Sequence, residues 1–373
     1  MTTSGCSSNH AFVCEGGVLW AFGDNSAGQL GVGDRENRLV PALVPFEGPF
    51  IRQIATGAEH SLLLDEEGHV RGAGSAFHGH PEGPLFVRML QQPKRMIVVA
   101  AGGWHSAAID EEGSLWTWAQ SDRGTTSGQL GIGTLLLPEI PQRVSNLPPV
   151  VQVHCGWNFT FAETSDGELW SFGQNGMGML GLGHENNVLE ATRVSISGLP
   201  SGRLRSVAAI LHSTVLVDSQ GGLWITGGGV FGDQDSSMHF HRVSFLPSLH
   251  LVVAGCDHFI AQDEMDEVWG WGSSAQGQLG IGDPAVNGPQ IALPRRLPWF
   301  SGALQITTGS YSTYVTMSNG QLHVAGENGL GQLGMIDPLR LQLPVHFPIA
   351  STLRPDVTFK EKRPKSALSL ATD

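Results

Sequence analysis

The sequence predicts an all-β fold, a seven-bladed β-propeller. One short pattern recurs seven times at a period near 50 residues, each recurrence reads as three to four short strands, and no segment keeps the 3.6-residue apolar period of a helix. One small sheet cannot bury both of its faces, whereas seven sheets arranged radially can. We therefore expect one propeller over residues 1–350 and a C-terminal tail over residues 351–373.

The first signal of the repeat is a strand that stops at a glycine-rich turn. Residues 19–33 read LWAFGDNSAGQLGVG, where the aromatic run of Trp20 and Phe22 ends at Gly23. Glycine adopts the positive φ that other residues resist, so a tight turn is expected there. Successive positions equivalent to Trp20 lie 45 to 54 residues apart, at Arg71, Trp116, Trp170, Trp224, Trp269 and His323.

A second signal precedes each of these strands: a small residue, often glycine, followed three positions later by His-Ser or a relative. Each unit then reads as an apolar strand such as residues 52–57, the His strand, an acidic-Gly turn, the Trp strand, a GQLG segment and a Pro-containing connector such as residues 39–44. Because the histidine recurs at one place in each blade, we interpret it as a hydrogen-bond donor or acceptor between blades. The histidines assigned to this place are His10, His60, His105, His212 and His258.

Closure of the ring requires the two ends of the chain to meet. The first unit begins at the His10 strand without the apolar strand that precedes it in the other units. We therefore expect a strand from one end to complete a blade begun at the other. Residues 355–359 (PDVTF) are one candidate, and the block before them serves equally well; about the last eight residues are expected to be disordered.

Composition narrows the classes of function. The net charge of −13 makes a general electrostatic route to nucleic acid poor. The four cysteines show no CxxC spacing, the N-terminus lacks a secretory pattern, and no apolar run reaches the length of a membrane span. We expect a monomer in the cytoplasm, the nucleus or both, with no bound metal or cofactor and no covalent catalysis, since no hydrolase, P-loop or Rossmann motif is present.

With these residues in place, the chain resembles the regulator of chromosome condensation repeat family. The shared signature is Gly-x-x-His-Ser, a DG turn, a WG strand and GQLGxG; GQLG begins at Gly28, Gly128, Gly277 and Gly331. Units two and five lack it. The resemblance implies a propeller and three kinds of function: nucleotide exchange on the small GTPase Ran with nucleosome docking, protein-interaction platforms attached to kinases or ubiquitin ligases, and ultraviolet-B perception.

The third unit carries the most informative irregularity. From the Trp position to GQLG takes 8 residues in unit one and 12 in unit three. In the Ran exchange factor, an insertion in this stretch forms a wedge against the phosphate-binding region of the GTPase. The resemblance thus implies a partner-binding wedge loop made of Gln120, Ser121, Asp122, Arg123, Gly124, Thr125 and Thr126.

Two residues of this loop suit a GTPase partner. Asp122 would disturb the Mg²⁺ and phosphate site, and Arg123 would pair with an acidic switch residue. The alternatives stay open: a tolerated surface insertion without a role, and a non-catalytic scaffold or substrate-recognition module for a signalling or ubiquitin-ligase assembly.

Other sites have weaker support. The pairs His78/His80 and His239/His241 place two imidazoles on one side of a strand, but zinc takes three or four ligands. The Gly-Trp-Arg-His-Thr segment of the photoreceptor is approached only at Trp104 and Trp157, without the arginine. Residues 1–34 contain no Lys or Arg, so the basic arm of the chromatin-bound relative is missing.

Overall fold

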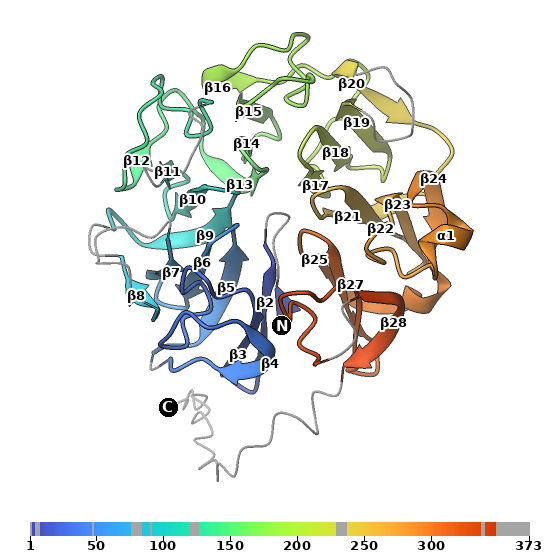
Figure 1. The fold of residues 1–373 in the computed structure, drawn as a ribbon. Helices are drawn as coiled ribbons and strands as arrows, with labels where there is room; N and C mark the ends of the chain where they lie inside the picture. Colours follow the sequence, from blue (N-terminus) through green and yellow to red (C-terminus); the bar gives the residue numbers. More distant parts are fainter. Residues whose placement is uncertain are drawn as a thin grey trace, which may run out of the picture.

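Seven four-stranded antiparallel sheets stand around a central axis, which confirms the predicted seven-bladed β-propeller (Figure 1). This computed structural model describes residues 2–3, 8–46, 48–75, 84–89, 92–119, 127–228, 237–336 and 340–347. The strands of each blade follow one another in sequence order from the axis to the rim, so each repeat of the sequence is one blade. The boundary between propeller and tail at residue 350 stays a prediction.

The strands are short throughout. Blade 1 has β1 (Thr2–Thr3), β2 (His10–Glu15), β3 (Val18–Gly23) and β4 (Arg38–Leu43); blade 2 has β5 (Ile51–Thr56), β6 (His60–Asp65), β7 (Val70–Gly74) and β8 (Val87–Arg88). Blade 3 has β9 (Met96–Ala101), β10 (His105–Asp110), β11 (Leu115–Ala119) and β12 (Gln142–Arg143); blade 4 has β13 (Val150–Cys155), β14 (Phe159–Thr164), β15 (Leu169–Gly173) and β16 (Val188–Arg193).

The second half of the ring repeats this order. Blade 5 has β17 (Ser206–Ala209), β18 (Ser213–Val217), β19 (Leu223–Gly227) and β20 (Ser237–Val243); blade 6 has β21 (Leu249–Ala254), β22 (His258–Asp263), β23 (Val268–Ser273) and β24 (Gln290–Arg296). Blade 7 has β25 (Ala303–Thr308), β26 (Ser312–Met317), β27 (Leu322–Glu327) and β28 (Arg340–Phe347); α1 (Pro284–Asn287) and the 3₁₀ turn η1 (Pro298–Phe300) are the helical elements.

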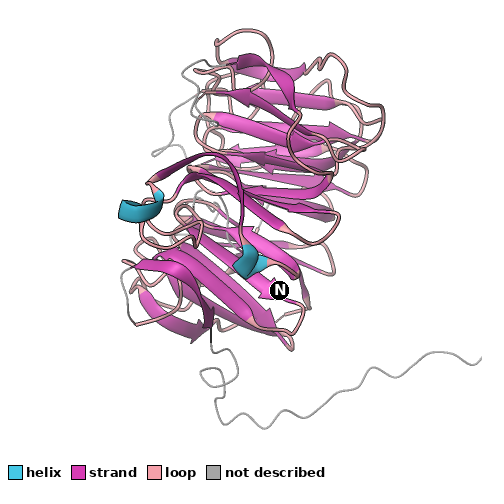
Figure 2. Cartoon of the chain, turned by 90° about the vertical axis from the view of Figure 1, so that its right-hand side faces the viewer, coloured by secondary structure: helices cyan, strands magenta, loops and turns pink. Residues whose placement is uncertain are grey.

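The antiparallel order gives the disc two different faces (Figure 2). Connections between the first and second strands, and between the third and fourth strands, fall on one face, here called the loop face. Connections between the second and third strands, and those between blades, fall on the other, here called the turn face. The Gly-x-x-His loops and the GQLG segments therefore share the loop face, whereas the acidic-Gly turns lie on the turn face.

The expected exchange of a terminal strand is wrong for the described part of the chain. β1 supplies the first strand of blade 1, with Thr2 opposite Val13, and β25 to β28 complete blade 7. Two threonines carry no apolar pattern, so this strand could not be predicted from the residues. Phe22 of blade 1 and Tyr314 of blade 7 lie in one apolar cluster with ring centroids 6.4 Å apart, so side-chain packing helps to close the ring. Residues 355–359 lie outside the described residues.

The Pro-containing connectors are the fourth strands of their blades. Pro41 lies in β4, Pro294 in β24 and Pro344 in β28. A fourth strand is an edge strand, where proline is tolerated because an N–H that points to solvent is not needed by the ladder.

The repeated histidines connect neighbouring blades, which confirms their structural interpretation. Each Nε2 atom lies within hydrogen-bond distance of a hydroxyl of the next blade: His10 to Ser61 (2.7 Å), His60 to Ser106 (3.0 Å), His105 to Thr160 (2.9 Å) and His258 to Thr313 (3.1 Å). Burial lowers the pKa of His10 to about 3. Burial, with a smaller contribution from His60, lowers the pKa of His105 to about 3, so both imidazoles are neutral at pH 7.

The same hydroxyls explain the GQLG segment. Ser61 donates to the carbonyl of Gln29 (2.8 Å) and Thr160 to the carbonyl of Gln129 (2.9 Å), so in both pairs the glutamine belongs to the preceding blade. Since the hydroxyl proton is used on the carbonyl, the histidine must donate from Nε2. A Cβ at Gly57 would lie 2.2 Å from the His60 ring, which explains the glycine three residues before the histidine.

His212 does not belong to this set. Ser213 lies opposite Gly227 as His60 lies opposite Gly74, so the sequence assignment in blade 5 was wrong by one residue. His212 itself is exposed. Ile210 occupies the place of Gly57, and a side chain fits there because no imidazole covers it.

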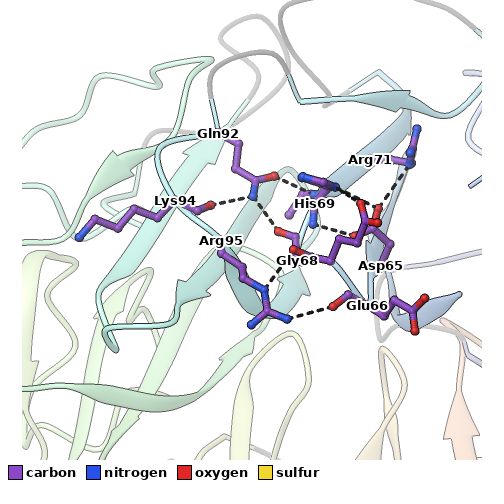
Figure 3. A network of polar contacts seen from close by, with 10 residues as sticks. Asp65, Glu66, Gly68, His69, Arg71, Gln92, Lys94 and Arg95 are labelled. Carbon is purple, nitrogen blue, oxygen red and sulfur yellow. Dashed lines mark hydrogen bonds and ion pairs between the residues drawn. The ribbon is translucent and has the colours of Figure 1, made fainter. Parts of the chain in front are cut away.

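The acidic-Gly turns hold the Trp strands in three blades. In each of them, Oδ2 of the turn aspartate accepts a hydrogen bond from the indole N–H: Asp110 from Trp116 (2.9 Å), Asp218 from Trp224 (2.7 Å) and Asp263 from Trp269 (3.0 Å). In blade 2 the Trp position is Arg71, whose Nε lies 3.8 Å from Asp65 Oδ2 (Figure 3). The side chains of Gln92 and Arg95 donate hydrogen bonds to backbone carbonyls of this turn: Gln92 Nε2 to Gly68 O (2.7 Å) and Arg95 Nη2 to Glu66 O.

Candidate partner-binding surface

The predicted wedge loop lies outside the described residues. This applies to all seven of its members, Gln120, Ser121, Asp122, Arg123, Gly124, Thr125 and Thr126. The structure places the two ends of the connection: β11 ends at Ala119, whose N–H donates to Pro138 O (3.0 Å), and Ser127 N donates to Gln129 Oε1 (2.9 Å). The connection joins the third and fourth strands of blade 3, so it leaves from the loop face.

Two tryptophans lie near the base of this connection. Ala119 is paired with His105, so Trp104, one residue earlier, lies at the same end of blade 3. Trp104 contacts Trp157 of blade 4 edge-on, with ring centroids 6.3 Å apart and an interplanar angle of 90°. Gly103 N also donates to Trp157 O (3.0 Å). Both indoles are half-buried, so they present aromatic surface on the loop face.

These tryptophans were not predicted as site residues. Their sequence context resembles the light-sensing segment of the photoreceptor only in part, because no arginine accompanies them. The available signal was positional: each lies in the short connection between the first and second strands, away from the strand position at which most of the other tryptophans recur.

On the loop face, blades 6 and 7 carry polar and ionisable groups. Tyr311 of blade 7 is half-buried, and burial first, then the nearby Cys256, Asp257 and Glu327, raises the pKa of its phenol. Asp257 accepts a hydrogen bond from Gln278 Nε2 (3.1 Å). The loop face therefore has an aromatic side at blades 3 and 4 and a more acidic side at blades 6 and 7.

An apolar groove begins where the wedge connection leaves β11. We call it the blade 3 groove; it has a volume of about 840 Å³ and is lined by Ile132, Thr134, Leu135, Leu136, Leu137, Pro138, Ile140, Gln142 and Arg143. Leu136 is 74% exposed. The hydrogen bond from Ala119 to Pro138 joins the groove directly to the first end of the predicted wedge loop.

This surface suits protein recognition better than chemistry on a small molecule. Aromatic and aliphatic side chains with few polar neighbours are typical of the centre of a protein interface. Among the described residues, no three His, Cys, Asp or Glu side chains gather as metal ligands. His239 and His241 lie in β20, while His78 and His80 lie outside the described residues. Within the described part of the chain, no helix is long and apolar enough to cross a membrane.

The blades, with their Gly-x-x-His loops and GQLG segments, make the protein a propeller built from sequence repeats, and comparison with known proteins identifies the repeat. Residues 16–64, 112–162 and 266–316 match the regulator of chromosome condensation (RCC1) repeat, and residues 150–178 match a second description of that repeat. The chain is therefore a seven-bladed propeller that contains RCC1 repeats, as the resemblance predicted.

Curated relatives share under a third of their residues with it. The chain is 29% identical over 299 residues to the mitochondrial RCC1 domain-containing protein RUG3 of Arabidopsis thaliana (74% of this chain, 66% of RUG3). It is 28% identical over 325 residues to the ultraviolet-B receptor UVR8 of the same plant (84% and 60%). It is also 28% identical over 300 residues to the human E3 ubiquitin-protein ligase HERC2 (75% and 6%). The chain thus spans two thirds or less of the length of these relatives.

Solved structures agree on the fold. Human WBSCR16 superposes with a TM-score of 0.77 at 21% identity, covering 88% of this chain and 93% of that one. Prp20p of Saccharomyces cerevisiae superposes with a TM-score of 0.71 at 21% identity (83% and 80%), and its structure is described together with its binding to Gsp1p and histones. One relative, RUG3, is mitochondrial, so the expected cytoplasmic or nuclear location of this chain stays a prediction.

Proposed function

We propose that this propeller recognises a Ran-type small GTPase on its loop face and accelerates release of the bound nucleotide. The observation that carries the proposal is the longer third-to-fourth-strand connection of blade 3, residues 120–126, on the same face as the Trp104–Trp157 pair. Prp20p, a propeller of similar fold, is described with its binding to Gsp1p.

The proposed mechanism needs no covalent chemistry. An exchange factor binds the nucleotide-free GTPase more tightly than the loaded form, and linkage then requires the nucleotide to bind the complex less tightly. In this mechanism Asp122 weakens the Mg²⁺ and phosphate site of the GTPase, and Arg123 pairs with an acidic switch residue. Trp104 and Trp157 supply apolar contact area beside the loop.

The test is release of fluorescent GDP from a panel of small GTPases that includes Ran, with and without the full chain. We expect acceleration by about a hundredfold or more for one member, a loss of about 2.7 kcal/mol from the barrier. Deleting residues 121–126 should abolish this acceleration and leave the melting temperature nearly unchanged, because β11 ends at Ala119 and β12 begins at Gln142, both outside the deletion. Equal activity in the deletion variant would rule out the wedge.

A matched control uses the opposite face. The double variant Glu66→Ala and Glu67→Ala alters two acidic residues in the blade 2 turn, on the turn face, so it should exchange nucleotide at the normal rate. The double variant Asp122→Ala and Arg123→Ala should lose most of the acceleration. Equal losses in the two variants would show that the loss does not come from a contact of the wedge loop.

A flat panel would favour the second candidate, a recognition module without exchange activity. The specific support is HERC2, a ubiquitin-protein ligase in which the matching region is 6% of the length, so a propeller of this class occurs there as one part of a much larger protein. An affinity pull-down compared between the wild type and a Trp104→Ala variant would then identify a partner of the loop face.

A further inference from the structure

The outer edge of blade 3 carries an arginine without the carboxylate that its counterparts in blades 4 and 6 have. Arg143, Arg193, Arg242 and Arg296 occupy equivalent places, each opposite the Trp position of its blade. Arg193 Nη2 pairs with Glu168 Oε1 (2.7 Å), and Arg296 Nε with Glu267 Oε2 (2.7 Å).

Blade 3 has a serine where blades 4 and 6 have glutamate, and blade 5 has Gly222 at that position. Ser114 N donates to Asp110 Oδ1 (2.8 Å) as Glu267 N donates to Asp263 Oδ1 (3.0 Å), so Ser114 holds the same turn position as Glu267. A serine cannot pair with the guanidinium at that place. Arg143 is exposed and makes no ion pair with any residue that the structure describes.

The segment beside Arg143 is also unlike its counterparts. After the glycine-rich turn, blade 1 continues with the polar DREN and blade 4 with HENN, whereas blade 3 continues with TLLLPEIP. In blades 1 and 4 an asparagine pair closes the connection, Asn25 N to Asn37 Oδ1 (2.9 Å) and Asn175 N to Asn187 Oδ1 (3.0 Å). Those blades show that the fold does not need aliphatic residues here.

The aliphatic side chains of blade 3 are open to solvent. Leu135 is 51% exposed, Leu136 74% and Ile140 42%, and they line one groove with Arg143 at its end. An exposed apolar patch of this kind, rimmed by polar groups, marks an interaction site more often than chance surface. Arg143 is the charged residue in the lining of the groove, in a chain whose net charge is −13.

We propose that the blade 3 groove binds an acidic, amphipathic helical segment of a partner protein, with its aliphatic side chains on Leu135, Leu136 and Ile140 and a carboxylate on Arg143. Pro138 and Pro141 interrupt the edge and disfavour addition of an extended strand, so helix-in-groove binding is the mode that fits. The groove lies beside Ala119, where the connection that contains residues 120–126 begins. The idea that the groove binds the same partner as those residues rests on the proposed function.

The test uses the full chain and a defined probe. The probe is a fluorescein-labelled 18-residue helical peptide with leucines at i, i+3, i+4 and i+7 spacing and glutamates between them. A second peptide replaces each glutamate with lysine. Fluorescence anisotropy should show saturable binding of the acidic peptide, with the lysine peptide bound about tenfold more weakly or worse.

Variants then locate the binding site. Leu136→Asp and Arg143→Glu should each weaken binding of the acidic peptide about tenfold or more, and Arg143→Glu should improve binding of the lysine peptide. Matched controls are Leu293→Asp and Arg295→Glu on the outer strand of blade 6, which should bind like the wild type. All of these positions are exposed, so melting temperatures should stay within about 3 °C of the wild type.

Several outcomes would overturn the proposal: no binding of the acidic peptide, equal losses in blade 3 and blade 6 variants, or equal affinity for both peptides. A wild-type dimer in light scattering that Leu136→Asp converts to a monomer would also overturn it, because the occupant would be a second copy of the chain. Failure of nucleotide exchange with intact, groove-dependent peptide binding would refute only the proposed function. Exchange that survives Leu136→Asp, together with no peptide binding, would refute only the groove.

Discussion

Blade 4 meets its two neighbours through different chemistry. On one side, His105 Nε2 lies 2.9 Å from Thr160 Oγ1, and Thr160 donates to Gln129 O. On the other side, Phe159 occupies the histidine position, while Thr214 still donates to Met179 O (2.9 Å). The hydroxyl-to-carbonyl bond is present at both boundaries and the imidazole at only one.

The histidine and the hydroxyl-to-carbonyl bond are therefore separate parts of the repeat motif. The ring of Phe159 packs edge-on against Phe161 (6.1 Å between centroids) in an apolar cluster that extends into blade 5 through Leu216 and Phe240. An aromatic ring thus replaces the imidazole without loss of the boundary, and the hydroxyl bond is the part that both boundaries keep. We infer that the histidine adds a hydrogen bond and a dependence on pH that the apolar boundary lacks.

The largest expected effect is acid destabilisation of the histidine boundaries. His10 and His105 have folded-state pKa values of about 3, against about 6.5 when unfolded, so the unfolded chain binds more protons between these values. Their contribution is therefore complete above pH 6.5 and is lost as the pH falls toward 3. At pH 5 the two together should cost about 4 kcal/mol, measured by urea unfolding at pH 7.5 and pH 5.0.

A variant that copies the apolar boundary provides the control. His10→Phe combined with His105→Phe should remove most of this pH dependence. His154, whose pKa burial lowers to about 4, remains and contributes a residual slope in the same direction. An unchanged pH dependence in the double variant would contradict the assignment.

The next effect is loss of one histidine at neutral pH. His60→Ala removes the partner of Ser106 and should lower the free energy of unfolding by about 1–3 kcal/mol in chemical denaturation at pH 7.5. His212→Ala is the matched control, because that histidine is exposed and outside the boundary set, and it should stay within about 0.5 kcal/mol of the wild type. Equal losses would mean that the boundary bond adds nothing.

The smallest effect is a gain, at the turn of blade 4. Thr164 stands where blades 3, 5 and 6 have the turn aspartate, and the buried indole N–H of Trp170 has no acceptor among the described residues. Thr164→Asp should supply that acceptor and raise the free energy of unfolding by about 1 kcal/mol, measured by thermal and urea unfolding. A loss of stability would show that the neighbouring Asp166 and Glu168 repel the added carboxylate more than Trp170 attracts it.

The fold was predictable because its signals are local and repeated. Gly57, His60 and the GQLG glutamine each satisfy a contact within the blade or with the next one, and the same contact recurs around the ring. Where a unit departs from the pattern, the prediction is wrong by a small amount: His212 precedes a serine as the boundary histidines do, but it lacks the glycine that the imidazole requires.

The candidate surface was less predictable, for physical reasons. The length of the connection in blade 3 pointed to residues 120–126, but a sequence count carries no loop geometry, and those residues stay a prediction. Trp104 and Trp157 meet only because two blades bring them together. Arg143 lacks a carboxylate partner because Ser114 stands where blades 4 and 6 have glutamate. This difference is recognised only when the strand register aligns the blades.

The consecutive order of strands within each blade also bears on how the chain folds during synthesis. Every sheet pairs residues from one stretch of about 50 residues, so pairing within a blade needs no segment that is still to be made. At about 5–20 residues per second, a ribosome delivers one such stretch in roughly 3–10 s, far longer than hairpin formation takes. Blades can therefore add to the growing arc one at a time, and the contacts between blades 1 and 7, such as that of Phe22 with Tyr314, must wait until the last blade has emerged.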